Sequence, residues 1–172
     1  AISLNDFEIR SKQMQIIAQT GVPEVAKLYI ASKAIANRSI KTLSQYRYKL
    51  IIFFESMCKP YNDITTNDIR MYLYNYKMSH NASDRYMENI RITLNSFFQW
   101  LVDNEYIQRN PCAKVEKIRF EEKKREPLSS YDLEYFRWNT ENIREKALID
   151  FLFSTGIRVS ECADVRLSDI DW

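Results

Sequence analysis

Glycine is scarce in this chain: only 2 of the 172 residues are glycine, where average usage would give roughly 12. Rossmann and P-loop designs need glycines where the backbone approaches phosphate, and tight β-hairpins use them for positive φ. The scarcity therefore argues against both of these nucleotide-binding designs and against β-sandwiches and barrels. With 45% hydrophobic and 13% aromatic residues, the chain still has ample material for a packed core.

Cysteine and histidine are also few. Cys58, Cys112 and Cys162 are odd in number and widely spaced, and the sequence has no CxxC motif or Cys/His cluster. We therefore expect reduced thiols in a cytoplasmic protein, with no structural zinc, no disulfide framework and no other metal. No apolar run reaches the ~18 residues that a membrane span needs. Because the sequence begins at Ala1 without methionine or a signal peptide, we expect an excised piece of a longer protein.

Acidic residues are absent between Glu24 and Glu55, a stretch that carries six basic residues: Lys27, Lys33, Arg38, Lys41, Arg47 and Lys49. Residues 1–126 hold 20 basic against 14 acidic residues, a balance of +6, whereas residues 127–172 hold 5 against 9, a balance of −4. A basic half that also carries tyrosine is compatible with a phosphate-binding surface. A solvated helix face is the alternative, and charge alone favours it.

Helical periodicity runs through most of the chain. We expect helices over about residues 3–20, closed by Gly21, then from Pro23, over 41–57, from Thr65 to about 78, and from Ser83. The helix from Pro23 is expected to place on one side Val25, Leu28, Tyr29, Ser32 and Ile35. The last helix is expected to bury a stripe of Tyr86, Ile90, Leu94, Phe97, Phe98 and Leu101. Thr65 and Asp68 predict a capping box, with Ile64 and Ile69 packed across it.

Composition changes after residue 113. Residues 114–126 alternate basic and acidic side chains with little apolar content, which predicts a basic linker. Beyond it, Ser129 and Asp132 predict a second capping box, and a helix from about Asn142 is expected to end at Gly156. We thus expect four parts: an N-terminal helical extension (1–20), a helical domain (21–113), the linker (114–126) and a further helical piece (127–172).

The stretch from Ser154 to Glu161 carries the clearest chemistry. A helix ends on Gly156, the chain turns and restarts with Arg158, and Glu161 follows three residues later. On one helix face the carboxylate can hold the guanidinium in place, and a guanidinium so held is suited to grip a phosphate. The alternative is an ordinary surface ion pair, which the spacing alone favours.

Five segments, in order, resemble the tyrosine site-specific recombinase or phage-type integrase family over residues 39–172. They are 39–46 (SIKTLSQY); 64–69 (ITTNDI); 94–101 (LNSFFQWL) with 107–112 (IQRNPC); 125–128 (REPL); and 155–161 (TGIRVSE) with 167–171 (LSDID). The resemblance implies an all-α fold, with a SAM-like core-binding domain of four to five helices up to about residue 113. Residues 127–172 would then be the truncated helical start of the catalytic domain.

The family's chemistry gives Arg158 and Glu161 their expected roles. Such enzymes cut and rejoin DNA through a 3′-phosphotyrosyl intermediate, without metal or nucleotide cofactor, in the integration and recombination of mobile elements. Arg158 would be the first catalytic arginine, binding the scissile phosphate, and Glu161 would support it. The family's remaining catalytic residues lie beyond this box. His80 lacks an arginine three residues on, so we interpret it as an exposed loop residue, and we expect the chain alone to bind DNA without cutting it.

In this family the core-binding domain clamps one side of a double-stranded recombination site. The expected DNA contacts on the helix over 41–57 are Lys41, Thr42, Gln45, Arg47 and Lys49. On the helix from Ser83 they are Ser83, Arg85, Asn89 and Arg91, and in the linker Lys123, Lys124 and Arg125. The basic residues would mainly neutralise phosphates, while Asn89 or Arg91 could reach a base edge. Self-association of the full-length protein on DNA is expected, and residues 1–20 are a hypothetical aid to assembly.

Two other functions stay open at this point. One is a stand-alone helical DNA-binding regulator, and the other is a helical protein-interaction module with an incidentally basic surface. Salt-dependent binding to duplex DNA separates the protein-interaction module from the regulator and from the recombinase, which both bind DNA.

Overall fold

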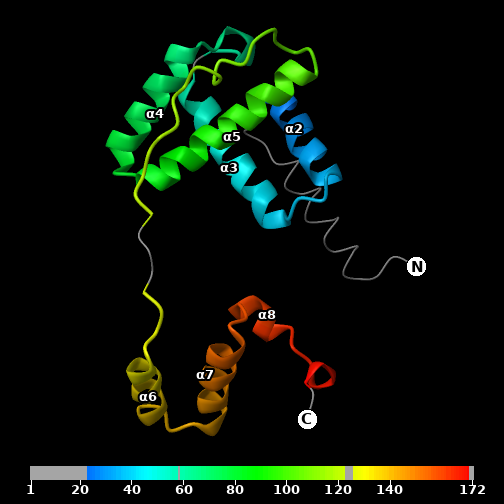
Figure 1. Cartoon of the computed structure of the whole chain (residues 1–172). Helices are drawn as coiled ribbons and strands as arrows, with labels where there is room; N and C mark the ends of the chain where they lie inside the picture. The colour runs from blue at the N-terminus through cyan, green and yellow to red at the C-terminus, as the bar shows by residue number, and fades with distance from the viewer. Residues whose placement is uncertain (1–22, 58, 123–125, 171–172) are drawn as a thin grey trace, which may run out of the picture. The chain divides into compact units, whose positions relative to one another are not determined.

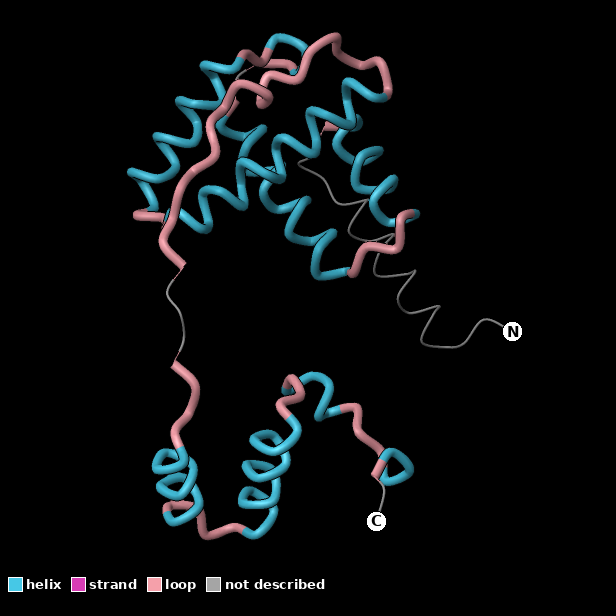
Figure 2. The backbone as a smooth tube through the Cα atoms, viewed as in Figure 1, coloured by secondary structure: helices cyan, strands magenta, loops and turns pink. Residues whose placement is uncertain are grey.

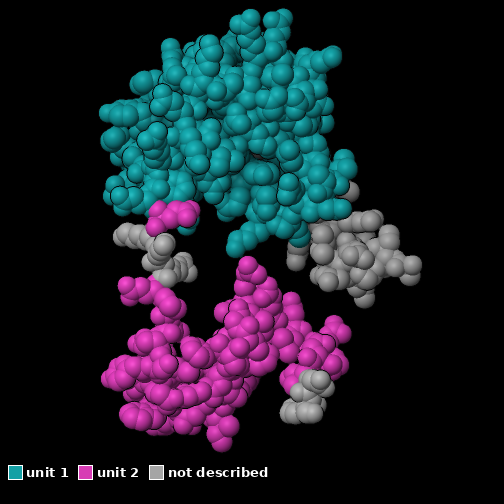
Figure 3. All heavy atoms as spheres, viewed as in Figure 1, with its two compact units in different colours: residues 1–121 teal, residues 122–172 magenta. Residues whose placement is uncertain are grey.

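The computed structural model describes residues 23–57, 59–122 and 126–170. Within these ranges all regular elements are helices and no strand occurs, which confirms the all-α prediction (Figures 1 and 2). The chain divides into two compact units, Ala1–Glu121 and Glu122–Trp172, coloured separately in Figure 3. The helix predicted over residues 3–20 lies outside the described residues.

Unit 1 contains four α-helices among its described residues: α2 (Glu24–Ile35), α3 (Ile40–Ser56), α4 (Thr66–His80) and α5 (Asp84–Asp103). A short 3-10 helix, η1 (Tyr61–Asp63), connects α3 to α4. Unit 2 contains α6 (Ser130–Trp138), α7 (Ile143–Thr155), α8 (Val159–Ala163) and the 3-10 helix η2 (Leu167–Asp169).

Helix α4 begins at the predicted capping box. The backbone N–H of Asp68 donates to Thr65 Oγ1 at 3.3 Å, and the N–H of Thr65 donates to Asp68 Oδ2 at 2.8 Å. Ile64 and Ile69 are both buried, as expected for apolar residues that bracket a capping box. The helix runs to His80, two residues further than predicted, and is capped by Asn81, whose φ of 46° is left-handed. Asparagine tolerates this conformation better than most residues, so it can close a helix.

Helix α5 organises the core of unit 1, because it contacts each of α2, α3 and α4; in Figure 1 it runs across α3. Leu94, Phe97, Phe98 and Leu101 are fully buried and Ile90 is 1% exposed, which confirms the predicted stripe except at Tyr86, which is half-buried. Aromatic rings meet edge to face around them, with the Tyr29 and Phe97 centroids 5.3 Å apart. Burial of each such large side chain stabilises the fold by about 1.5–3 kcal/mol.

The predicted apolar side of α2 is only partly correct. Val25 and Tyr29 are buried as expected, together with Ala26 and Ile30. Leu28 and Ile35, in contrast, are 51% and 84% exposed. Because apolar residues occur all round this helix, its own periodicity does not single out the buried face.

The beginning of the predicted linker is packed onto unit 1. Val115 is 9% exposed, and Ile118 packs against the core. The backbone N–H of Ile118 donates to Glu88 Oε2 at 2.9 Å, and Arg70 Nη2 donates to the Lys114 carbonyl at 2.9 Å. The two apolar side chains and these hydrogen bonds fix residues 114–118, the beginning of the predicted basic linker, against unit 1.

Unit 2 has almost no buried core. Leu133 is its only buried apolar side chain among the described residues. An apolar groove of about 470 Å³ between α6 and α7 is lined by Pro127, Leu128, Leu133, Phe136, Ile149, Leu152 and Phe153. Across these helices, Arg137 pairs with Asp150 at 2.7 Å. Exposure of Trp138 (83%) and Ile143 (83%) adds to the open apolar surface.

Candidate functional site

The turn that carries Arg158 is formed by a glycine. Gly156 caps α7 with a φ of 64°, and its N–H donates to the Leu152 carbonyl at 3.0 Å. This left-handed conformation suits glycine, which has no Cβ to clash with the backbone. Arg158 follows as the N-cap residue of α8 in an extended conformation, with φ −73° and ψ 152°. Arg158 therefore lies just before α8. The sequence pattern predicted it within the new helix, so that prediction is corrected by one position.

Glu161 holds Arg158 by two hydrogen bonds. Its Oε2 accepts the backbone N–H of Arg158 at 2.8 Å, and its Oε1 accepts from Arg158 Nη1 at 2.9 Å. The backbone bond first, and the side-chain bond second, lower the pKa of Glu161, so the carboxylate stays charged. The Arg158 side chain is 83% exposed. The arrangement fixes one edge of the guanidinium and leaves the rest open to solvent.

On α3, the predicted contact residues differ in exposure. Lys41 and Gln45 are exposed, Thr42 is half-buried, and the Thr42 N–H donates to the Ser39 Oγ cap at 3.2 Å. Arg47 is half-buried, and its Nε is buried without a hydrogen-bond partner among the described residues. The open polar positions thus lie mainly in the first half of α3.

Lys49 lies in a different environment from the one predicted. It is 4% exposed, and its Nζ donates to Asn89 Oδ1 at 2.8 Å and contacts Thr93 Oγ1 at 3.4 Å on α5. The ammonium also lies 6.0 Å from the centre of the Tyr86 ring. Desolvation lowers the pKa of Lys49. Because these groups surround the ammonium, Lys49 is an internal connection between α3 and α5 and not an exposed phosphate contact.

Arg91 on α5 is likewise engaged inside the unit. Its Nε and Nη2 donate to Glu88 Oε2 and Oε1 at 2.8 and 2.7 Å, and the Arg91 side chain is 15% exposed. The hydrogen bonds from Arg91 lower the pKa of Glu88, against the opposing effect of burial. A guanidinium already paired with a buried carboxylate is poorly suited to reach a base edge, which is the role that the sequence predicts for Arg91.

The other α5 residues lie toward its beginning. Ser83 caps the helix and accepts the Tyr86 N–H at 3.3 Å. The Arg85 guanidinium lies 5.4 Å from the centre of the Phe120 ring, a cation–π contact. Asn89 is exposed, although its Oδ1 accepts a hydrogen bond from the buried Lys49. The structure therefore joins the α3 and α5 sets through Lys49 and Asn89, while Lys123, Lys124 and Arg125 lie outside the described residues.

Sequence reasoning missed Glu88. It is 4% exposed and accepts hydrogen bonds from both Arg91 and the Ile118 backbone. The three-residue spacing to Arg91 was a usable signal for the ion pair. The burial and the contact with Ile118 were not visible in the sequence, because they depend on how the chain returns after α5.

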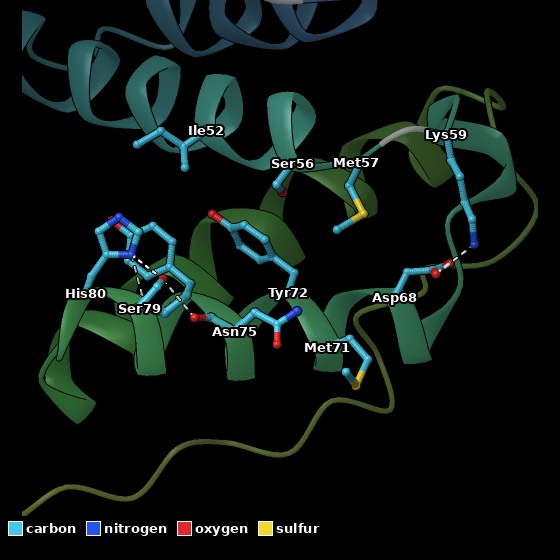
Figure 4. Close-up of a pocket in the computed structure, with 11 residues that line it drawn as sticks. Ile52, Ser56, Met57, Lys59, Asp68, Met71, Tyr72, Asn75, Ser79 and His80 are labelled. Carbon is cyan, nitrogen blue, oxygen red and sulfur yellow. Dashed lines mark hydrogen bonds and ion pairs between the residues drawn. The ribbon is translucent and has the colours of Figure 1, made fainter.

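A second groove, between α3 and α4, contains none of the predicted contact residues (Figure 4). Its volume is about 480 Å³, and Met57, Met71, Tyr72 and Asn75 are among its lining residues. His80 also lines it, as the last residue of α4 and not in a loop as predicted. The imidazole ring stacks on Tyr76 with centroids 4.2 Å apart, and its Nδ1 lies 2.8 Å from Ser79 Oγ.

Two features are absent from the described residues. No group of three or more His, Cys, Asp or Glu side chains is arranged to hold a metal ion. In the same part of the chain, no helix combines the length and apolar character needed to cross a membrane.

Comparison with known proteins identifies the family. Residues 29–105, which span most of α2 and all of α3, α4 and α5, match the model of the phage integrase N-terminal SAM-like domain. The chain is 32% identical over 148 residues to tyrosine recombinase XerC of Anoxybacillus flavithermus, covering 79% of this chain and 48% of that protein. The chain belongs to the tyrosine recombinase family. Its helical domain is the SAM-like core-binding domain of that family.

Other relatives give the same assignment. Tyrosine recombinase XerD of Rickettsia bellii is 27% identical over 158 residues, covering 87% of this chain and 50% of that protein. XerC of Listeria welshimeri is 29% identical over 145 residues, covering 78% and 48%. The chain thus spans about half the length of the curated relatives it matches. No solved structure matches it.

Proposed function

We propose that this chain is the DNA-binding portion of a tyrosine recombinase, in which unit 1 binds a double-stranded recombination site. The observation that carries the proposal is the direct connection of the two polar helix surfaces through Lys49 and Asn89, 2.8 Å apart. Lys41 and Gln45 of α3 and Arg85 and Asn89 of α5 are all exposed on unit 1, in which α3 packs against α5. Cations supply affinity for the phosphate backbone, and uncharged polar side chains can contact bases or phosphates.

The proposed contact set is narrower than the sequence suggested. Lys41, Thr42, Gln45, Arg47, Ser83, Arg85 and Asn89 belong to it, whereas Lys49 and Arg91 support it from inside the unit. Lys123, Lys124 and Arg125 are proposed to follow the DNA backbone between the core-binding and catalytic parts. The recombinase is further proposed to self-associate on its site.

Unit 2 is proposed to begin the catalytic domain. Arg158, 83% exposed at the Gly156 turn, would bind non-bridging oxygens of the scissile phosphate and stabilise the charge that builds up in the transition state. Glu161 would orient the Arg158 guanidinium, which it holds through the bond to Nη1. In the parent protein a tyrosine attacks the phosphorus, the 5′-oxygen leaves, and a 3′-phosphotyrosyl bond conserves the linkage for rejoining. We expect the present chain to bind DNA without this step.

Two measurements test these roles. Fluorescence anisotropy with a labelled DNA duplex at low salt is expected to show binding by this chain, and an absence of binding would contradict the DNA-binding role. In the parent recombinase, Arg158→Lys is expected to abolish strand cleavage while leaving site binding largely intact, because lysine lacks the two-pronged donor geometry. Normal cleavage by Arg158→Lys would contradict the catalytic role.

A further inference from the structure

Lys49 and Asn89 together fix which hydrogen-bonding groups unit 1 presents to its ligand. The Lys49 ammonium has three N–H donors and no acceptor. It lies 2.8 Å from the Asn89 side chain, so the atom that faces it must be the amide oxygen. The chemistry of the partner therefore settles the orientation of the amide, which in an isolated asparagine is ambiguous.

The environment of Lys49 leaves it little freedom. It is 4% exposed, and its second polar neighbour is Thr93 Oγ1 at 3.4 Å. The Thr93 hydroxyl donates to the Asn89 backbone carbonyl at 2.9 Å, so that a lone pair of Oγ1 faces the ammonium. The Tyr86 ring centre lies 6.0 Å away on the same helix. Asn89 Oδ1 is therefore the closest acceptor of a buried positive charge, and swinging it away would leave that charge poorly satisfied.

The outward atom of Asn89 is then its Nδ2. Asn89 itself is exposed, and among the described residues its Nδ2 donates no hydrogen bond. We infer that Lys49 is a positioning residue that holds Asn89 as a donor-only contact, directed at a hydrogen-bond acceptor of duplex DNA. This inference rests on the proposed function of unit 1.

A donor-only asparagine has a defined specificity. Paired recognition of adenine uses the amide oxygen and nitrogen together, on adenine N6 and N7. With Oδ1 turned toward Lys49, the amide oxygen and nitrogen do not both face one base edge, so that paired contact is disfavoured. Asn89 can still donate to a phosphate oxygen or to a base acceptor such as guanine O6 or N7, or thymine O4. It should disfavour the cytosine N4 amino group, which is itself a donor.

The test uses this chain and a fluorescein-labelled duplex of mixed sequence, with anisotropy at low salt and thermal unfolding of every variant. Asn89→Asp keeps an acceptor for Lys49 but replaces the outward donor by a carboxylate oxygen. It should weaken DNA binding at least as much as Asn89→Ala, about 3- to 10-fold or more, without lowering the melting temperature. Asn75→Ala, at an exposed α4 position, is the matched control and should bind like the wild type.

Lys49 is tested by a double-mutant cycle. Lys49→Met should weaken binding by the same factor as Asn89→Ala, and the double variant should be no weaker than either single one, because both remove the same contact. Lys49→Arg keeps a donor-only cation and should retain binding. Additive losses of the two single variants would overturn the inference. If Lys49→Met fails to fold, wild-type binding by Asn89→Asp would still overturn it.

Duplexes of only A·T and only G·C pairs distinguish the acceptors. An equal loss on both for Asn89→Ala assigns an acceptor that both duplexes share, a phosphate oxygen or a purine N7. An unequal loss assigns guanine O6 or thymine O4. If the wild-type chain binds no duplex, the proposed function fails together with this inference. If the wild type binds and Asn89→Asp binds equally, only the inference fails.

Discussion

Glu88 and Arg91 form a two-bond ion pair on one face of α5, with donor–acceptor distances of 2.8 and 2.7 Å and only 5% and 15% of their side chains exposed. Glu88 Oε2 also accepts the backbone N–H of Ile118 at 2.9 Å. One carboxylate thus satisfies a guanidinium and fastens the chain that leaves the core-binding domain.

Glu88→Gln is expected to destabilise the chain by about 1–3 kcal/mol, because it leaves a largely desolvated guanidinium without its counter-charge. Urea unfolding measures the loss, and hydrogen exchange at the Ile118 amide should accelerate. Glu116→Gln, at an exposed acid outside this network, is the control and should change stability by less than about 0.5 kcal/mol. Equal effects of the two substitutions would show that the ion pair is not structural.

The capping box of α4 should make stability depend on pH. Hydrogen bonds from Lys59 and then from Thr65 lower the pKa of Asp68 from 3.8 to about 2. The folded-state pKa is thus below the unfolded one, so the stabilisation is complete above pH 4 and is lost as pH falls toward 2. Asp68→Asn should flatten the decline in melting temperature over this interval. An unchanged pH profile for Asp68→Asn would contradict the assignment.

Phe97→Ala should be among the most damaging substitutions in the chain. The side chain is fully buried and packs against Tyr29 of α2 and Phe54 of α3, and truncation of a buried phenylalanine costs about 3–5 kcal/mol. Phe153→Ala removes the same atoms from a side chain that is 47% exposed in unit 2, and it should cost far less. Chemical denaturation monitored by circular dichroism compares the two, and similar losses would contradict the burial pattern.

The two units should differ in local stability. Unit 1 buries a continuous aromatic and aliphatic core, whereas Leu133 is the only buried apolar side chain of unit 2 among the described residues. Amide exchange in the middle of α7 should therefore be at least about 100-fold faster than in the middle of α5, because exchange follows the free energy of local opening. Equal protection of α5 and α7 would mean that unit 2 has a stabilising core of its own.

The sequence predicted well where local signals agreed. The capping boxes at Thr65 and Ser129 depend on residues three positions apart, and both form as expected. The stripe from Ile90 to Leu101 has a strong helical period and is buried along its length. Gly156 ends α7 in the left-handed conformation, as a helix-closing glycine usually does.

What the sequence could not show depends on distant partners. Lys49 was assigned to an exposed polar face, but its closest acceptor, Asn89, lies 40 residues away in the chain. Arg91 was given a base-reading role because nothing local revealed that Glu88 beside it is buried. For α2, apolar residues on all sides left the buried face to be chosen by α3 and α5. In each case tertiary packing decided between options that local patterns left equal.

The salt dependence of DNA binding tests the central claim most directly. The Kd of the wild-type chain for a mixed-sequence duplex is measured by anisotropy between about 50 and 200 mM KCl. If several cations of unit 1 contact phosphates, affinity should fall about 10- to 100-fold across this range, because bound counterions are released on association. A Kd that stays constant over the range, or no binding at the lowest salt, would contradict a DNA-binding role and favour a protein-interaction module.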